Sequence, residues 1–356
     1  MSRIKKLLNS MQQISQAAEF YHTSFWFQAS RVKRLHDKSL FSLEDTLFWG
    51  LTDPEIPAAE IDGFMSREAR TRLQARVNDP ARGPDVDDKA VFYSLCASCG
   101  LPVPETFGIL ETAGNPRTAH TLPPQAVKIS FSALPDGDFV AKPIWGMKGK
   151  GLLFFRKAGD QYHLDGSTLD EAAISKVADG YAAKDYLIVQ RRLLPHPALA
   201  DTSDTDAVQS VRIVTYLDGN GMAHILFARF KFIRQGNNVD NFADGQTGNL
   251  IADVDLDSGR IKKTLRKLVG EFGLQVLSLH PDTGKSLDIT LPDWSDAVQL
   301  AIAGAKQFNS LRTLAWDIAL TPDGPVILEA NQDWEIFPIA PYRKPSPAGD
   351  WESLVR

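Results

Sequence analysis

The chain has 356 residues, of which 43% are hydrophobic and 23% are charged, as in an ordinary soluble globular protein. A chain of this length can bury a sizeable core and usually divides into two or three lobes. The formal net charge of −5 argues against a general nucleic-acid binder, and no apolar run approaches the ~18 residues that a membrane span needs. Because the N-terminus also lacks the apolar stretch of a signal peptide, we expect a cytoplasmic protein.

Residues 1–84 are predicted to form a helical N-terminal region. Lys and Arg side chains cluster in residues 31–38, where they indicate either a solvated helix face or a contact with a polyanion or a membrane surface. The breaker-rich segment 78–84 is the predicted boundary of the region. The first helix is predicted from the three- and four-residue spacing of Ile4, Leu7, Leu8 and Met11.

A second helix is predicted from Asp87 to Gly100, with aspartate as its N-terminal cap and glycine at its end. Lys89 lies in its first turn, where the helix dipole disfavours a cation and a bound anion would offset that effect; the alternative is a solvated surface lysine. The helix carries the only two cysteines, Cys96 and Cys99. Since no second pair exists to complete a zinc site, we interpret both as packing residues.

A glycine-rich connection follows in residues 138–155. A predicted strand carrying Lys142 leads into three glycines and then into an apolar strand. Backbone N–H groups in such a loop can approach phosphate oxygens without obstruction, and Lys142 can reach the same phosphates as a point charge. The pattern is not a Walker A loop, because the loop leads into a strand. The glycines are Gly146, Gly149 and Gly151.

Residues 185–194 are predicted to form a strand that joins two lobes, where backbone groups could recognise a base. His196, on the loop beside this strand, is either a ligand contact or a solvated side chain. A hairpin then follows, in which Arg212, Arg229 and Lys231 add positive charge to one sheet face, unless the alternation only marks a solvated surface.

The polar segment 237–249 is long for a loop, and such loops tend to be functional or mobile. Asp240 and Asn241 within it are candidate substrate contacts. A helix is expected over residues 261–272 and another over residues 294–308.

A hairpin near the C-terminus is the most informative stretch. Apolar strands at residues 314–320 and 326–331 flank a Pro-Asp-Gly turn, which is typical of a β-hairpin with a five-residue connection. We expect Leu320 to face Val326 across the turn. In that register one face is entirely apolar, and its residues are Trp316, Ile318, Leu320, Val326, Leu328 and Ala330.

The other face of this hairpin carries Asp317 opposite Glu329, and Asn331 opposite Ala315. Paired Cβ atoms lie roughly 4.5–5.5 Å apart, so the two carboxylates repel unless a cation lies between them. Oxygen ligands of these types suit Mg²⁺. The alternative is a wet outer face on which the acids only add solubility.

These features, in this order, resemble those of ATP-grasp enzymes over roughly residues 85–340. The resemblance implies an α+β fold in which two lobes, residues 85–186 and 187–356, grip ATP after the helical region 1–84. The residues that resemble the family are Asp88-Lys89, Lys142 with its glycine loop, the strand at residues 189–193, Asp317, Glu329 and Asn331. Residues 211–215, 239–241, 280–284 and 316–319 further resemble the branch named for its association with sugar-transfer genes.

The resemblance also implies ATP and Mg²⁺ as cofactors, with Asp317, Glu329 and Asn331 as metal ligands. Lys142 would act on the transferred phosphoryl group, and Arg212 or Arg229 would steady the acyl phosphate. Nucleotide contacts are implied for Lys89, Lys142, Gly146, Lys148, Gly149, Gly151, Gln190 and Leu193. Many members have acidic residues in the linking strand, where this chain has Gln190, Arg191 and Arg192.

The implied reaction is that of a ligase. A carboxylate attacks the γ-phosphate of ATP to give an acyl phosphate and ADP, and an amine then displaces phosphate. Positioning and electrostatics dominate phosphoryl transfer, which explains the lysines, the metal ligands and the backbone N–H groups. The partners would be a carboxylate and an amine, each a small molecule or a peptide. The alternatives are a kinase acting on a hydroxyl of a small molecule and a non-catalytic nucleotide-binding protein.

Overall fold

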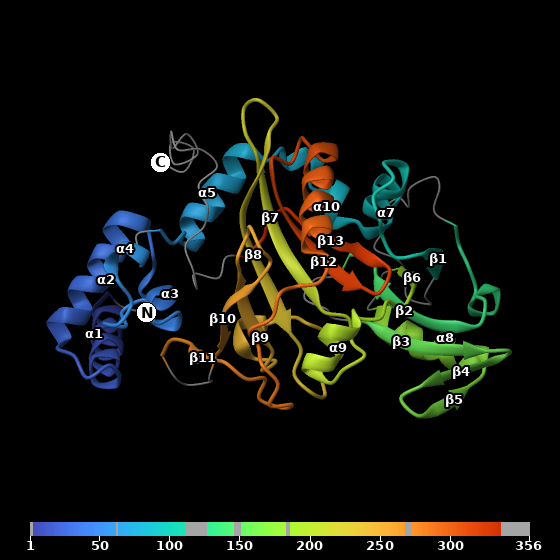
Figure 1. Ribbon diagram of the computed structural model, residues 1–356, viewed down its shortest axis with the longest axis horizontal. Helices are drawn as coiled ribbons and strands as arrows, with labels where there is room; N and C mark the ends of the chain where they lie inside the picture. Colours follow the sequence, from blue (N-terminus) through green and yellow to red (C-terminus); the bar gives the residue numbers. More distant parts are fainter. Residues whose placement is uncertain are drawn as a thin grey trace.

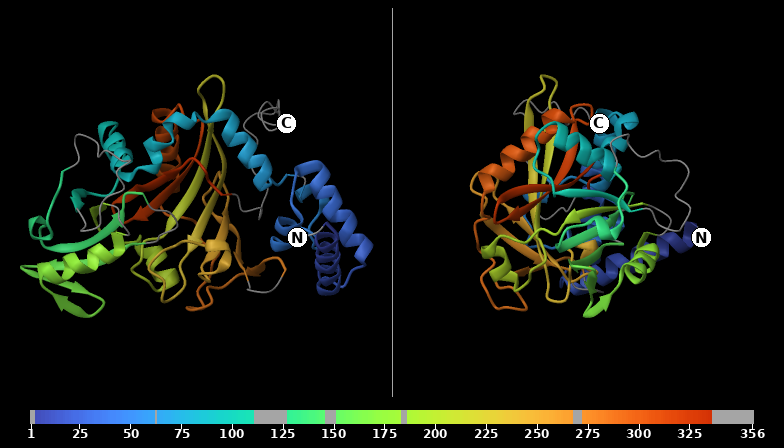
Figure 2. Two further views of the ribbon diagram at one scale, coloured as in Figure 1. Left: turned by 180° about the vertical axis from the view of Figure 1, so that it is seen from behind. Right: turned by 90° about the vertical axis from the view of Figure 1, so that its right-hand side faces the viewer.

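A seven-stranded sheet at the centre of the molecule separates a group of N-terminal helices from a six-stranded sheet (Figure 1). The left-hand view of Figure 2 shows the same order of parts from behind. The chain therefore has the helical N-terminal region and the α+β character expected from the sequence. The computed structural model describes residues 3–61, 63–110, 127–145, 151–182, 186–267 and 272–335.

The N-terminal region is helical, as predicted. Ser24, Ser42 and Ser66 begin three of its helices, and each hydroxyl accepts a hydrogen bond from the backbone N–H three residues later. Such caps satisfy N–H groups that the helix itself leaves unpaired. The helices are α1 (Arg3–Phe20), α2 (Phe25–Ser39), α3 (Leu43–Phe48), α4 (Ala58–Ile61) and α5 (Arg67–Val77).

Two apolar clusters join these helices to the central sheet. Trp49 and Phe64 pack with Ile251 and Leu265 of that sheet, and α5 packs on it through Leu73. The N-terminal region is thus anchored by buried apolar surface, which is the main favourable contribution to such contacts.

The six-stranded sheet is antiparallel throughout, in the order β1-β6-β2-β3-β4-β5. Alternate residues of β2 are buried, and Phe139 stacks on Phe155 in a core that α8 (Glu171–Ala182) covers with Ile174. The strands are β1 (Thr106–Leu110), β2 (Gly137–Pro143), β3 (Leu153–Ala158), β4 (Gln161–Leu164), β5 (Ser167–Leu169) and β6 (Leu187–Arg191). Strand β6 begins at residue 187, where the second lobe was predicted to start, but pairs within this sheet.

The central sheet has the order β11-β10-β9-β8-β7-β12-β13 and is also antiparallel. Its core includes Trp316, which is fully buried against α10 (Trp294–Gln307). The strands are β7 (Ser210–Leu217), β8 (Ala223–Phe232), β9 (Leu250–Val254), β10 (Ile261–Arg266), β11 (Gln275–Leu277), β12 (Thr313–Thr321) and β13 (Gly324–Asn331).

The helix expected over residues 261–272 is wrong. Ile261–Arg266 forms strand β10, which pairs with β9 and β11, and residues 268–271 lie outside the described part of the chain. Ile261 and Leu265 are four residues apart and both buried, so the spacing fits either a helix or a strand. Tertiary pairing decides between them.

The helix predicted from residue 87 is α7 (Lys89–Ser98), and the Asp88 carboxylate accepts hydrogen bonds from two N–H groups of its first turn. Cys96 is buried in the apolar cluster of the central sheet, as predicted, and burial raises the pKa of its thiol to about 12. The packing interpretation is wrong for Cys99, which is exposed beyond the end of the helix. The short helices are α6 (Pro84–Asp87), α9 (Pro197–Ser203) and the 3₁₀ turns Pro80–Arg82, Phe131–Ala133 and Ala243–Gly245. Within the described ranges, no helix has the length and apolar character that crossing a bilayer requires.

Candidate nucleotide-binding site

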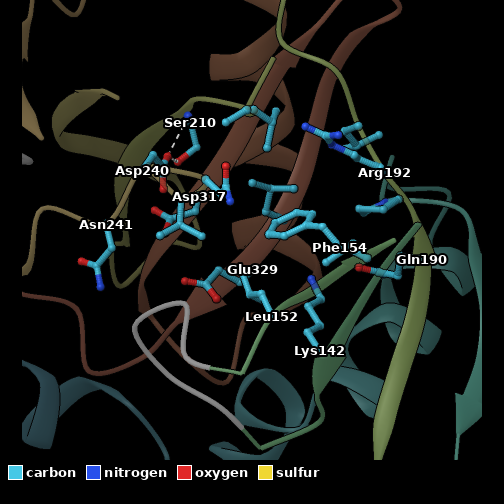
Figure 3. A pocket seen from close by; sticks show the side chains of 18 of the residues that line it. Lys142, Leu152, Phe154, Gln190, Arg192, Ser210, Asp240, Asn241, Asp317 and Glu329 are labelled. Carbon is cyan, nitrogen blue, oxygen red and sulfur yellow. Dashed lines mark hydrogen bonds between the residues drawn. The ribbon is translucent and has the colours of Figure 1, made fainter. Parts of the chain in front are cut away.

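A cavity of about 770 Å³ opens between the two sheets. Strands β2, β3 and β6 contribute to one wall and strands β7, β8, β12 and β13 to the other. Its walls differ in charge. Figure 3 shows Asp240, Asp317 and Glu329 on one side and Lys142 and Arg192 on the other. A ligand with both anionic and cationic or metal-bound parts would match that polarity.

The acidic wall is built on the hairpin β12–β13. Asp317 lies opposite Glu329, and Ala315 lies opposite Asn331, as predicted. The predicted turn is wrong, because Leu320 pairs with Pro325 and the strands continue to Thr321 and Gly324. Two residues, not five, connect them.

A β-bulge reconciles the shorter turn with the acidic pair. Asp317 pairs with Glu329 while Ile318 pairs with Ile327, so Leu328 is an extra residue in β13. We predicted Leu328 on the apolar face of the hairpin, but its side chain lines the cavity instead. Its backbone carbonyl accepts a hydrogen bond from the Tyr93 hydroxyl at 2.5 Å.

Asp317 is held by two cations. The Nε and Nη2 atoms of Arg212 each donate to one of its carboxylate oxygens at 2.7 Å, and Lys231 Nζ lies 3.4 Å from Oδ2. Burial alone would raise the pKa of Asp317, but Arg212 and Lys231 hold it well below its usual value. Asp317 is therefore an anion at any ordinary pH.

Glu329 and Asn331 extend this acidic wall. Asn331 Nδ2 donates to Glu329 Oε1 at 3.2 Å, and both side chains line the cavity beside Asp317. These oxygen donors fit a hard divalent ion such as Mg²⁺. The described residues contain no group of three or more His, Cys, Asp or Glu side chains that could hold a metal ion. The present set does not count as one, since its third member is the amide of Asn331.

Lys142 faces this wall from β2. Its Nζ donates to the Tyr93 hydroxyl at 2.6 Å and lies 4.9 Å from the centre of that ring. Burial, with a smaller contribution from nearby Lys89 and against the opposing effect of Glu329, lowers the pKa of Lys142 to about 7. Burial likewise raises the pKa of Tyr93, so its hydroxyl stays protonated and can donate to Leu328. The Lys142 ammonium is thus positioned but short of negative partners.

Strand β6 supplies another part of the wall. Gln190 Nε2 donates to Thr106 Oγ1 at 2.9 Å, and Gln190 Oε1 is buried and accepts no hydrogen bond from the described residues. Arg191 pairs with Glu105 at 3.2 Å and Arg192 with Asp206 at 2.9 Å. Leu193 also lines the cavity.

A sequence model of the family described as "Sugar-transfer associated ATP-grasp" matches residues 68–341. The chain belongs to this family. This match confirms the predicted ATP-grasp fold and the predicted resemblance to the sugar-transfer branch.

Solved ATP-grasp structures are similar to this chain only at low identity. The ADP complex of N5-carboxyaminoimidazole ribonucleotide synthetase is 14% identical, with a TM-score of 0.38 over 71% of this chain and 46% of that chain. D-alanyl-alanine synthetase A from Vibrio cholerae is 10% identical, with a TM-score of 0.37 over 72% and 58%. The biotin carboxylase domain of the Hydrogenobacter thermophilus 2-oxoglutarate carboxylase, solved with MgADP, is 12% identical, with a TM-score of 0.38 over 70% and 40%.

This chain therefore spans about half the length of the ATP-grasp structures it matches. No curated protein sequence matches it significantly.

The structure brings most of the predicted ATP-grasp residues together. Lys89, Asp240 and Asn241 all line the cavity. Lys89 is buried, and its ammonium donates to the Ile144 carbonyl. Asp240 accepts hydrogen bonds from Lys231 Nζ at 3.2 Å and from the Ser210 N–H at 2.8 Å. Gly151 has φ +76°, a conformation that favours glycine, while Gly146, Lys148 and Gly149 lie outside the described residues.

Arg229 and His196 are not brought to the cavity, so the structure does not support their predicted roles. Arg229 is buried and donates to Asp253 Oδ1 at 2.6 Å on the neighbouring strand β9. His196 caps helix α9, where its Nδ1 accepts from the Ala198 N–H at 3.2 Å. Sequence alternation cannot show that Arg229 faces a buried partner of its own.

Two residues of the site, Tyr93 and Lys231, were not predicted from the sequence as site residues. Tyr93 lies behind Lys142, and Lys231 contacts both Asp240 and Asp317. The alternation of β8 did place a positive charge at Lys231, but nothing in the sequence near Tyr93 marks it as a neighbour of Lys142. Such contacts arise only once α7 is packed against the hairpin.

Proposed function

We propose that this ATP-grasp protein is an ATP- and Mg²⁺-dependent ligase that joins a carboxylate to an amine through an acyl phosphate. The observation that carries the proposal is the convergence of Lys142, Arg212 and the Asp317–Glu329–Asn331 set on one cavity. Each is a group that phosphoryl transfer needs, since the reaction depends on neutralising and aligning phosphate oxygens.

The nucleotide would lie along the basic wall. Lys142 and Lys89 would contact its phosphates, and the backbone beside Leu193 would meet the adenine. Gln190 Oε1, buried without a donor, would accept a hydrogen bond from the adenine amino group. Arg191 and Arg192 are engaged by Glu105 and Asp206, so they do not block that wall.

Glu329, Asn331 and Asp317 would hold Mg²⁺. When bound, the ion neutralises phosphate charge and fixes the triphosphate relative to the incoming nucleophile. Asp317 would share its oxygens between the ion and Arg212, whose guanidinium already occupies both of them. Glu329 and Asn331 carry no such cationic partner in the described residues.

The chemistry would proceed in two steps. A carboxylate oxygen attacks the γ-phosphorus, the bond to the β-phosphate oxygen breaks, and ADP leaves. The amine nitrogen then attacks the acyl carbon, loses a proton, and expels inorganic phosphate. Arg212 and Lys231, which meet at Asp317, would supply positive charge next to the acyl phosphate.

The first test is a search for products. The purified protein is incubated with ATP, Mg²⁺ and fractions of a metabolite extract, and the products are identified by mass spectrometry. We expect a product whose mass is that of a carboxylate plus an amine minus water, with ADP and phosphate formed in equal amounts. A carboxylate labelled with ¹⁸O would pass one label to phosphate, which reports the acyl phosphate directly.

Two aspartate variants of the same hairpin give a matched comparison. Asp317→Ala removes a cavity-lining carboxylate, whereas Asp323→Ala removes an exposed one in the turn. We expect the first to abolish product formation and the second to leave it unchanged. A stable phosphoester without free phosphate would identify a kinase, and ATP binding without turnover in any fraction would identify a non-catalytic nucleotide-binding protein. Either result overturns the proposal.

A further inference from the structure

The first half of helix α1 presents an apolar face that is exposed among the described residues of the chain. Its four members are exposed to between 46% and 71%. Positions three, four and seven residues apart lie on one side of a helix, so they form a continuous stripe, called here the α1 stripe. Large apolar patches left in contact with water are typical of interaction sites. The α1 stripe consists of Ile4, Leu7, Leu8 and Met11.

The same side of α1 is buried further along the helix. Ile14 is half-buried and Ala18 is buried, and both continue the spacing of the stripe. One end of the apolar side therefore packs within the protein, while the other end extends past it. In the right-hand view of Figure 2, the N-terminal end of α1 reaches the edge of the molecule. The stripe is uncovered because of where the helix projects.

The N-terminal region that carries the stripe is rich in positive charge. Residues 1–40 contain seven Lys or Arg and two Asp or Glu, a net charge of +5 in a chain whose net charge is −5. Lys5 and Lys6 are exposed on α1 itself. Lys33 of α2 has 75% of its side chain exposed, and Trp26, at the start of that helix, is 79% exposed. A helix with an apolar side, adjacent lysines and a nearby exposed tryptophan has the composition of segments that lie in a bilayer interface.

We propose that α1 docks this protein on a membrane surface rich in anionic lipid. The α1 stripe would enter the boundary between headgroups and acyl chains, and Lys5, which flanks the stripe on the helix, would reach the lipid phosphates. The charge of this region selects an anionic surface over a neutral one, since each basic residue near such a surface strengthens binding roughly fivefold. In Figure 1, α1 lies at the opposite end of the molecule from strands β2 and β3, so docking leaves the cavity accessible. This inference does not depend on the proposed ligase reaction.

The test is co-sedimentation of the full chain with vesicles. Vesicles of phosphatidylcholine with 30% phosphatidylglycerol are compared with vesicles of phosphatidylcholine alone, at low salt and at about 0.5 M NaCl. We expect binding to the anionic vesicles, at least tenfold weaker binding to the neutral ones, and loss of binding at high salt, where charges are screened. Equal binding to both vesicle types, or none to either, overturns the proposal.

Variants locate the contact. Leu7→Asp with Leu8→Asp places charge in the α1 stripe, and Lys5→Glu with Lys6→Glu reverses the charge beside it; each pair is expected to weaken binding more than tenfold. Met222→Asp with Val276→Asp is the matched control, because both side chains are exposed apolar residues outside the N-terminal region. Circular dichroism and thermal unfolding verify that every variant is folded.

Two alternative results would be recognised by their own signatures. If the wild type forms a dimer in sedimentation velocity and the Leu7→Asp, Leu8→Asp variant does not, while vesicles bind neither, the stripe is an interface between two copies of this chain. If the control variant loses vesicle binding as strongly as the stripe variant, the contact lies elsewhere. Both results contradict membrane docking through α1.

Discussion

Arg212 donates from β7 to both carboxylate oxygens of Asp317 on the neighbouring strand β12, each at 2.7 Å. The two residues are directly paired in the sheet, and Asp317 is 4% exposed. A buried pair of this kind compensates the charge of a carboxylate that would otherwise require a metal ion or protonation. Asp317 can therefore stay ionised without a bound metal ion.

Asp317→Asn should destabilise the protein by about 3–5 kcal/mol at pH 7, because it leaves Arg212 and Lys231 buried without their anion. The cost should depend on pH. The pKa of Asp317 is lowered in the folded state, so its contribution to stability is present above about pH 4, the unfolded value, and is lost as the pH falls. Urea unfolding of both proteins at pH 7 and pH 3 should show the difference shrinking. A difference that is the same at both pH values would contradict this account.

Binding of ATP at pH 8 should be accompanied by uptake of up to about one proton per nucleotide. The pKa of Lys142 is about 7, so the side chain is mostly neutral at pH 8 until phosphates raise the pKa. Isothermal titration calorimetry in buffers with different ionisation enthalpies measures this uptake. Lys142→Met should bind more weakly and take up no proton, and Lys142→Arg, which is charged at every pH, should bind without uptake. Uptake that persists in Lys142→Met would assign the proton to another group.

Tyr93→Phe should lower the free energy of unfolding by about 1–3 kcal/mol, since the part-buried Leu328 carbonyl loses its donor and Lys142 loses its acceptor. ATP turnover should fall several-fold, because the ammonium is no longer held in place. Chemical denaturation and steady-state kinetics measure the two effects. Tyr181→Phe, in α8 of the six-stranded sheet, serves as the control. Unchanged turnover in Tyr93→Phe would mean that Lys142 needs no such support.

Two helical glycines should respond in opposite directions to alanine. A Cβ at Gly304 of α10 would lie 2.7 Å from the Trp316 ring, so Gly304→Ala should destabilise the fold by about 1–3 kcal/mol. Gly180 of α8 has open space around the same position, so Gly180→Ala should stabilise it by about 0.5–1 kcal/mol. Thermal and urea unfolding compare them. Stabilisation by Gly304→Ala would show that α10 can move away from β12 at little cost.

The register of the β12–β13 hairpin could be predicted from the sequence, but its turn could not. The pairing of Asp317 with Glu329 was predicted correctly, although the turn was not, because the bulge at Leu328 offsets the turn error by one residue. Alternating apolar residues favour a regular strand, and an extra leucine in such a run leaves no trace in the sequence. The acidic wall was predictable from the residue types and their order.

The residues of the opposite wall could be predicted from the sequence only in part. Lys142 was recognisable from its strand and glycine loop, whereas Tyr93, which holds it, comes from a helix 49 residues earlier. Arg229 and Lys231 alternate in the same strand, yet one bonds to Asp253 inside the sheet and the other reaches Asp317. Which of two equivalent positions meets the cavity is a property of neighbouring strands and cannot be read from their own pattern.

The bulged leucine has a consequence for shorter versions of this hairpin. Without Leu328, Ile318 and Ile327 would still face each other, and Asp317 and Glu329 would still be neighbours, so the strands could align without interruption. The carbonyl that accepts the hydrogen bond from Tyr93 belongs to Leu328 itself and would be lost with it. A protein without this one residue would keep the Asp317–Glu329 pair, but Tyr93, which holds Lys142, would lose its own acceptor.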